Sequence, residues 1–138
     1  MLTDARGVPI GLAVGGANTN DHKLLRQTIE SICVPRPRPT RQQPQGLCLD
    51  AGYDYAEVRQ VAESFGFTLH VKPRDYRTRA VERQAHKKAR RWVVERTHSW
   101  HNRFRRILVR WEKRADTWLG MLHLACGVIA WFHGVLPK

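Results

Sequence analysis

The amino-acid sequence predicts an α/β fold with long C-terminal helices, and three observations support this class. A short apolar strand at 46–50 is followed by a helical pattern that ends at Gly66, and a second strand follows at 67–71. Such a strand–helix–strand unit favours two parallel strands joined by a right-handed crossover. Two long helical regions are then expected at 79–114 and 116–133. The 138 residues are enough for one modest domain.

The N-terminal elements are predicted from turn residues and helical spacing. A strand end at residues 1–3 precedes the turn 4–7, and a strand follows at 8–14, which together predict a hairpin. A helix is expected after Asn20 or Asp21, either of which can cap it, because Leu25, Ile29 and Ile32 recur at helical spacing.

Asp50 comes directly after a predicted buried strand and is a candidate functional residue. The segment 34–46, with four of the seven prolines, precedes that strand and predicts an extended, mobile connector. Gly52 allows a sharp turn after Asp50, at the carboxyl end of the strand, where ligands gather in open α/β sheets. Asp50 is therefore either a ligand for a metal or substrate, or a residue that satisfies loop amides and caps the next helix with Asp54. The two readings are equally consistent with this stretch.

The segment "RRWVVERTHSWHNRFRRILVRWEKR", 90–114, predicts a helix with two distinct faces. One stripe is apolar and is expected to pack on the final helix: Val93, Trp100, Phe104, Ile107 and Trp111. The opposite face is polar: Arg91, Glu95, His98 and Asn102.

Glu95 is the one acidic residue between Glu82 and Glu112, and eight Lys or Arg lie between positions 87 and 106. A surface ion pair with Arg91 is the simplest interpretation. A second is that Glu95 holds a divalent cation at the centre of a phosphate-binding face, because Mg²⁺ prefers carboxylate oxygens and substrate phosphates. A third, a transition-metal site with His98 and His101, is disfavoured because the two histidines diverge around the helix and H-E-x-x-H is absent.

The positive charge is concentrated in one segment. Residues 1–71 carry seven basic and seven acidic side chains, residues 72–114 carry sixteen and four, and residues 115–138 carry one of each. A surplus of this kind, rich in arginine, is typical of proteins that bind nucleic acid. A solvated helix face would usually interleave both signs.

Cysteine usage and hydropathy indicate a cytoplasmic protein. Cys33, Cys48 and Cys126 form no C-x-x-C pair and are odd in number, which predicts reduced thiols in a cytoplasmic environment. The N-terminus lacks the pattern of a secretory signal. The apolar segment 117–132 is shorter than a membrane span and is interrupted by Gly and His, which predicts a buried core helix and no membrane.

Three motifs together resemble the DDE transposases of bacterial insertion sequences, families four and five. They are "LTDARGVPIGLAVGGANTND", "LDAGYD" and "RRWVVERTHSWHNRFRRILVRWEKR", in the family's order and spacing over nearly the whole chain. The resemblance implies an RNase H-like, retroviral integrase-type core over residues 1–138, with the connector at 34–46 and helices at 79–135. In such a core three carboxylates gather around two Mg²⁺ or Mn²⁺ ions.

The resemblance assigns roles to individual residues. Asp50 corresponds to the second catalytic aspartate and Glu95 to the glutamate, both as metal ligands, while Arg91 orients the phosphate or Glu95. Lys88 stands where the family has tyrosine, and Asn102 where it has lysine, with Arg103 able to substitute for that lysine. The residues expected to contact DNA are Lys88, Arg91, Arg103, Arg105 and Arg106.

The family's first catalytic aspartate precedes the hairpin, and Asp4 is not its counterpart, because "LTDARGVP" matches the turn after that aspartate. The chain is therefore expected to be the downstream part of a transposase, lacking the first strand of the core. Its implied partners are DNA (transposon ends and target), the upstream segment and further copies of itself, in the bacterial cytoplasm at the nucleoid. Alone it is expected to be inactive and prone to aggregation.

Two other function classes compete with this interpretation. The first is a non-enzymatic basic DNA-binding module, in which Asp50 and Glu95 are incidental. The second is a structural or RNA-associated protein, which is disfavoured because the aromatic residues are arranged as core positions and form no stacking platform. A DNA-binding module differs from a transposase because its action on DNA shows no dependence on Mg²⁺ or Mn²⁺.

Overall fold

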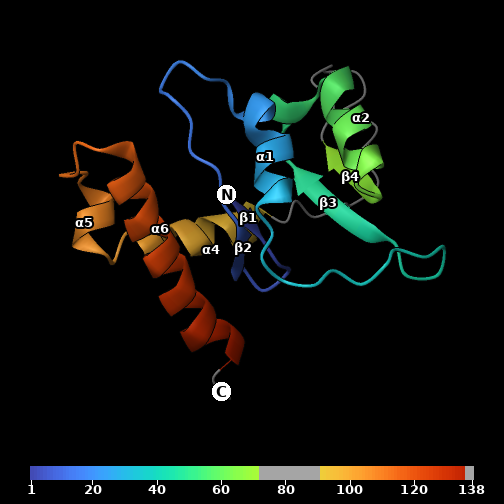
Figure 1. The fold of residues 1–138 in the computed structure, drawn as a ribbon. Helices are drawn as coiled ribbons and strands as arrows, with labels where there is room; N and C mark the ends of the chain where they lie inside the picture. The colour runs from blue at the N-terminus through green and yellow to red at the C-terminus, as the bar shows by residue number, and fades with distance from the viewer. Residues whose placement is uncertain (72–90, 136–138) are drawn as a thin grey trace. The chain divides into compact units, whose positions relative to one another are not determined.

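The structure, a computed structural model, describes residues 1–71 and 91–135 (Figure 1), and it contains both helices and strands, as the sequence predicts. It divides into two compact units, each of which is described here by itself. The first is composed of Met1–Gly16, Gln27–Val34 and Arg91–Lys138, and the second of Ala17–Arg26 and Pro35–Arg90.

The second unit contains the predicted strand–helix–strand motif. Strands β3 (Gln45–Leu49) and β4 (Phe67–Val71) pair in parallel, and helix α2 (Ala56–Ser64) lies beside them (Figure 1). The buried side chains of Leu47, Val58 and Ala62 come from this motif. The helix ends where Gly66 takes a positive φ of 74°, which glycine adopts without a steric penalty. The parallel pair predicted from the sequence is therefore confirmed.

The proline-rich connector has no regular secondary structure but is fixed at one end by Arg36. The Arg36 guanidinium donates hydrogen bonds to Gln45 Oε1 (2.8 and 3.1 Å) and to the carbonyl oxygen of Phe65 (2.9 Å). It also lies 3.8 Å from the ring centroid of Phe67, in a cation–π contact. The mobility predicted for this connector remains a prediction, and its start is attached to β3 through Gln45 and to β4 through Phe67.

The first unit begins with the predicted hairpin. Strands β1 (Leu2–Thr3) and β2 (Pro9–Gly11) are antiparallel, and Asp4 organises the turn between them. Asp4 Oδ1 accepts hydrogen bonds from the backbone N–H groups of Arg6 and Val8, both at 2.8 Å. Asp4 therefore has a structural role in the turn, as its position in "LTDARGVP" predicts.

The helix expected after Asn20 forms in two parts. A 3₁₀ turn, η1 (Asp21–Leu24), leads into helix α1 (Leu25–Glu30). Of the two predicted cap residues, Asn20 takes the cap position with an extended backbone, but its side chain makes no cap hydrogen bond. Beyond α1, Ser31 Oγ accepts a hydrogen bond from Leu12 N (2.7 Å), which attaches the end of the helix to the chain just after β2.

The long helix predicted up to Arg114 is interrupted. Its 79–90 portion lies outside the described residues, and helix α4 (Arg91–His101) is followed by the short helix α5 (Arg105–Leu108). Phe104 has an extended backbone between them. Arginines at 103, 106 and 110 would stand three and four residues apart on a continuous helix, and such like-charged pairs are destabilising. The apolar stripe predicted for one helix is accordingly wrong beyond His101.

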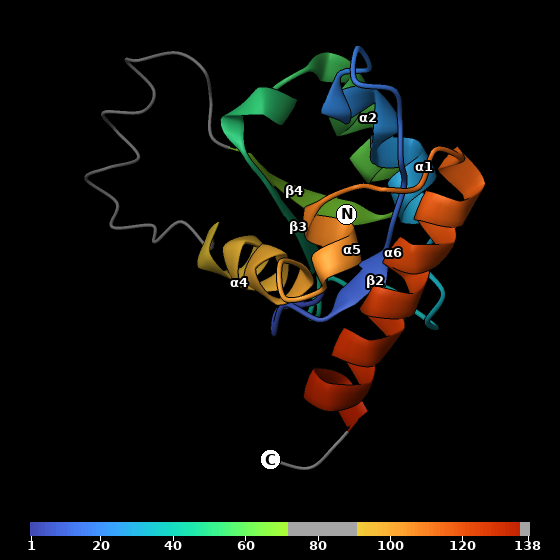
Figure 2. The same cartoon turned by 90° about the vertical axis from the view of Figure 1, so that its left-hand side faces the viewer.

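Helix α6 (Ala115–Ala130) and the π turn η3 (Trp131–Val135) complete the first unit, and Figure 2 shows β2 beside α6. Contacts with β2, α4 and α5 cover part of this helix. The prediction of a buried core helix is largely wrong, since 11% of its most apolar window is buried in the described structure. By length and composition, Ala115–Val135 is a candidate membrane span, a test that core helices of soluble proteins also pass.

Candidate functional site

Asp50 lies where β3 ends and holds the following turn in place. Its Oδ1 accepts a hydrogen bond from the N–H of Gly52 (2.8 Å), and its carbonyl oxygen accepts one from Tyr53 N (3.1 Å). Asp50 thus caps the 3₁₀ turn η2 (Ala51–Tyr53). A Cβ at position 52 would come within 2.9 Å of Asp50 Oδ1, so glycine is what permits this geometry. Capping of loop amides, one of the two readings left open by the sequence, is therefore observed.

Asp50 also lines a polar hollow of about 250 Å³ in the second unit. The residues around this hollow come from the start of η1 and from the loop after β3: Asn20, Asp21, His22, Asp50, Gly52, Tyr53 and Tyr55. The structure therefore brings a second carboxylate, that of Asp21, to the same hollow as Asp50. From the sequence alone Asp21 is expected only to cap a helix, because nothing local indicates which distant segment it meets.

Aromatic side chains line this hollow beside its acidic residues. Burial, followed by the negative charges of Asp21 and Asp50, raises the pKa of Tyr53 to about 12. The ring of His22 lies against that of Tyr55, with centroids 4.2 Å apart. The hollow thus contains two carboxylates and a neutral phenol, and its negative charge favours cations.

Glu95 lies on the exposed side of α4, as the sequence predicts, whereas Val93 and Thr97 face inward. The hydroxyl of Thr97, which is fully buried, donates a hydrogen bond to the carbonyl of Gly7 (2.5 Å). This bond attaches α4 to the hairpin turn and fixes the face on which Glu95 is presented. The side chain of Arg91 lies outside the described residues, so its pairing with Glu95 remains a prediction.

The alternative metal site of Glu95 with two histidines is wrong. His101 is 6% exposed, and its Nδ1 lies 3.0 Å from the carbonyl oxygen of Thr97. Its Nε2 lies 3.4 Å from Cys126 Sγ on α6, so both ring nitrogens contact protein atoms in the core. Within residues 1–71 and 91–135, no group of three or more His, Cys, Asp or Glu is placed to hold a metal ion.

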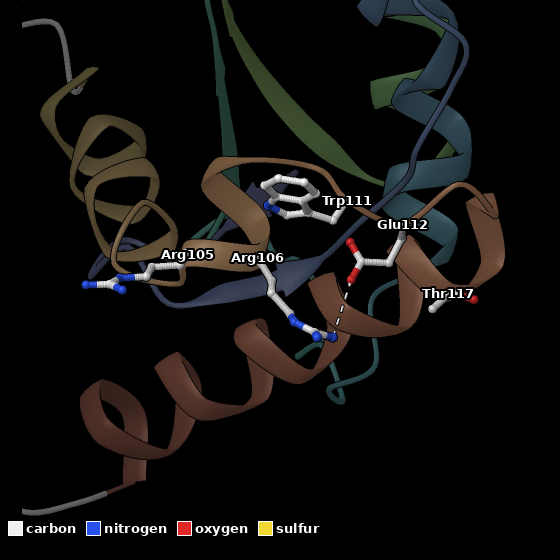
Figure 3. Close-up of a pocket in the computed structure, with 5 residues that line it drawn as sticks. All are labelled: Arg105, Arg106, Trp111, Glu112 and Thr117. Carbon is white, nitrogen blue, oxygen red and sulfur yellow. Dashed lines mark ion pairs between the residues drawn. The ribbon is translucent and has the colours of Figure 1, made fainter.

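The predicted DNA-contacting arginines that can be located are exposed. Arg103 follows α4, and Arg105 and Arg106 open α5. Arg106 Nη1 lies 3.7 Å from Glu112 Oε1 at the edge of a hollow of about 590 Å³ (Figure 3). Lys88 falls outside the described residues. Asp50 and Glu95 belong to separately described units, so their convergence also remains a prediction.

Mixed α and β secondary structure together with exposed arginines at 103, 105 and 106 is typical of the α/β class of nucleic-acid-binding proteins. Comparison with known families identifies the class. Residues 1–129 match the family model of the transposase DDE domain. The chain is also 36% identical over 135 residues to a Burkholderia cepacia protein named as a transposase for insertion sequence element IS402.

The chain belongs to the DDE transposase family. Membership implies an RNase H-like fold, which agrees with the resemblance found in the sequence. The alignment covers 95% of this chain and 61% of the length of the IS402 relative. No solved structure shows significant similarity to the chain.

Proposed function

We propose that the chain acts on DNA as part of an insertion-sequence transposase that cleaves a donor strand and transfers it into target DNA. Asp50 and Glu95 hold the Mg²⁺ or Mn²⁺ ions of the reaction, and Arg91, Lys88, Arg103, Arg105 and Arg106 bind the phosphate backbone. The observation that carries the proposal is Asp50, which lies at the carboxyl end of a parallel strand in a chain that belongs to the DDE family.

The donor atoms around Asp50 suit a hard divalent cation. Asp50 and Asp21 contribute carboxylate oxygens and Asn20 an amide oxygen to one hollow, and Mg²⁺ and Mn²⁺ prefer oxygen ligands. When bound, a pair of such ions activates the attacking oxygen and stabilises the leaving oxygen of a phosphoryl transfer. Glu95 adds the further carboxylate that this chemistry requires.

The protein groups have separate roles in this proposal. The Gly52 N–H holds Asp50 Oδ1 in a fixed position at the end of β3, so that the carboxylate is oriented before DNA binds. Burial of Thr97 fixes α4 and keeps Glu95 on its exposed face. The arginines neutralise the phosphates on either side of the reacting bond, which positions the strand.

The partners follow from the same proposal. They are transposon ends, target DNA, other copies of the chain and a segment that supplies the family's first aspartate, in the cytoplasm at the nucleoid. The 138-residue chain assayed alone offers Asp50 and Glu95, two of the three catalytic carboxylates expected for the family, with Asp21 beside Asp50 but not the family's first aspartate. We expect weak cleavage from it, because an incomplete catalytic set holds two cations poorly.

The test is metal-dependent cleavage of DNA carrying insertion-sequence ends. The chain is supplied with the upstream segment of an insertion-sequence transposase, and cleavage is measured with Mg²⁺ or Mn²⁺. Asp50→Asn and Glu95→Gln are each expected to reduce the rate by roughly a hundredfold or more, since even outer-shell changes at metal sites cost about 10–100-fold. DNA binding, measured in parallel, should persist in both variants.

Glu57→Gln is the matched control, because Glu57 is an exposed carboxylate in the first turn of α2, in the same unit as Asp50. It should cleave at the unmodified rate. Equal cleavage by Asp50→Asn and by the unchanged chain would contradict the proposal.

A non-enzymatic DNA-binding module is the second candidate, and one observation favours it. Asp50 already caps η2 through Gly52, which gives this carboxylate a structural role that needs no metal. On this interpretation DNA binding is indifferent to Mg²⁺ and Mn²⁺. Metal-independent binding, with no cleavage by the completed protein, would select the module over the transposase.

A further inference from the structure

A second hollow, of about 590 Å³, lies in the first unit beside α5 and the start of α6. It is lined by Arg105, Arg106, Trp111, Glu112 and Thr117 (Figure 3). Its volume falls within the roughly 300–1,000 Å³ of small-molecule sites in proteins. None of the residues predicted to hold metal lines it, so it requires its own explanation.

Glu112 has an unmet requirement for a hydrogen-bond donor. Its side chain is 8% exposed, and Oε1 faces Arg106 Nη1 at 3.7 Å, beyond hydrogen-bond distance (Figure 3). Its Oε2 is buried and, among the described residues, has no hydrogen-bond partner. Buried polar atoms are almost always paired, so an orphaned carboxylate oxygen in a hollow indicates a place for a ligand N–H group.

Trp111 gives the same hollow an aromatic surface. Its side chain is 77% exposed, although large aromatic residues are usually well covered in folded proteins. An indole in contact with water beside an unpaired acceptor is suited to stacking a planar group that also donates hydrogen bonds. Figure 3 shows the Arg106 guanidinium directed toward Glu112 and that of Arg105 directed away from it.

The basic residues around the hollow restrict the chemical class of ligand that it can bind. Between positions 105 and 114 there are five Lys or Arg and one acidic residue, Glu112, so a cationic ligand would be repelled. A simple anion would satisfy the arginines but could not donate to Oε2. The ligand that meets all three conditions is a nucleotide, which combines an uncharged aromatic base, N–H donors and an anionic phosphate.

We propose that this hollow binds an unpaired guanine of a DNA strand, with the base on Trp111, its N–H groups on Glu112 and the flanking phosphates on Arg105 and Arg106. Guanine fits best because N1–H and the 2-amino group are adjacent donors on one edge, which a carboxylate can accept in parallel. Adenine, cytosine and thymine have an acceptor beside every donor on that edge, so none of them offers two adjacent donors, and the acceptor would repel one of the carboxylate oxygens. The inference deepens the proposed function, since it depends on DNA being the substrate.

The test measures binding of the 138-residue chain to short, fluorescently labelled thymidine oligonucleotides with one central guanine, hypoxanthine or adenine. Fluorescence anisotropy should show hypoxanthine, which lacks the 2-amino group, bound about tenfold more weakly than guanine. This comparison uses the unchanged chain and is independent of any variant's folding. Equal affinity for guanine and hypoxanthine would overturn the guanine pocket.

Two substitutions test whether the preference for guanine arises in this hollow. Glu112→Gln should remove the preference for guanine over hypoxanthine and improve adenine binding, because an amide offers one donor and one acceptor. Trp111→Ala should weaken all three oligonucleotides about tenfold through lost stacking, whereas Trp131→Ala, at another exposed tryptophan, should not. Circular dichroism checks that the variants fold. An unchanged preference in Glu112→Gln would overturn the role of the carboxylate.

The outcomes separate this inference from the proposed function. Salt-sensitive binding of every oligonucleotide without a base preference overturns the pocket and leaves the DNA-binding proposal standing. Absence of binding to all of them overturns both. A guanine preference that survives in a chain whose completed form fails to cleave DNA supports the pocket and overturns only the catalytic proposal.

Discussion

The pKa of Tyr53 is sensitive to the two carboxylates that line the hollow at the end of β3. Its phenol is half-buried, and ionisation would place a third negative charge beside Asp21 and Asp50. Burial first, and then these two charges, raise its pKa from 10.0 to about 12. Tyr53 therefore provides a measurable signal for an arrangement that a sequence cannot reveal.

We predict that Tyr53 titrates near pH 12 in the folded protein, followed by the ultraviolet absorbance of the phenolate. Because the folded pKa is raised, the proton is bound more tightly in the folded state than in the unfolded state. The associated stability is fully present below about pH 10 and is lost as the pH rises from about 10 through 12. Denaturation in urea at pH 9 and at pH 11 should show this loss.

Three substitutions test which residues cause the late titration. Tyr53→Phe should remove the late-titrating phenol, which distinguishes it from the other two tyrosines of the chain. Asp21→Asn and Asp50→Asn should each lower its pKa, because each removes one of the opposing charges. A pKa unaffected by Asp21→Asn would show that Asp21 and Tyr53 do not share the hollow.

Single residues also show where sequence reasoning succeeds and where it fails. Asp50 was predictable, because a carboxylate at the end of an apolar strand is a local signal. Asp21 was not, since its approach to Asp50 depends on tertiary packing between distant segments. Trp111 was predicted to lie in the core from helical spacing, yet it is 77% exposed because the helix that defined the spacing ends ten residues earlier, at His101.

The attachment of α4 to the hairpin depends on a contact between small groups. Gly7 has a positive φ of 86°, and a Cβ there would lie 3.1 Å from both Thr97 Oγ1 and Val93 O. The close approach of the turn to the helix therefore requires glycine. Thr97 Oγ1 bonds the Gly7 carbonyl (2.5 Å) and lies 3.1 Å from the carbonyl of Val93, one turn earlier on the helix.

Thr97→Val should reduce the free energy of unfolding by about 1–3 kcal/mol, because it leaves the buried Gly7 carbonyl without its side-chain donor. Valine preserves the volume, so the loss reports on the hydrogen bond. Thr97→Ser is the matched control, since it keeps the hydroxyl and removes one methyl group. Urea unfolding measures both, and a Thr97→Val protein as stable as the unchanged chain would show that this bond does not attach α4.

At the level of elements, the β3–α2–β4 unit was predicted well and the C-terminal helices less well. The short apolar strand segments, the helical spacing between them and Gly66 as the helix terminator determine the former locally. Periodicity does not report the like-charged arginines that a continuous helix would bring together, nor the contact of His101 with Cys126 on α6 at the point where α4 ends.

At the scale of the whole chain, positive charge is distributed unevenly along the sequence. The first 71 residues are neutral, and the surplus of twelve positive charges lies between positions 72 and 114. In the described part of that segment the arginines at 103, 105, 106 and 110 are all exposed. The apolar residues Leu124, Trp131 and Phe132 of the C-terminal segment are exposed as well, at 55–63%.

Salt dependence tests whether this surface binds the DNA backbone. The logarithm of the affinity for duplex DNA should fall linearly with the logarithm of salt concentration, by about 0.9 for each phosphate neutralised. Arg105→Gln and Arg106→Gln should each flatten that slope by about 0.9, since each removes one cation from an exposed site. Arg38→Gln is the matched control, because Arg38 is an exposed arginine in the neutral part of the sequence and should leave the slope unchanged. Anisotropy titrations at several salt concentrations measure the slope, and equal slopes for all three variants would remove Arg105 and Arg106 from the interface.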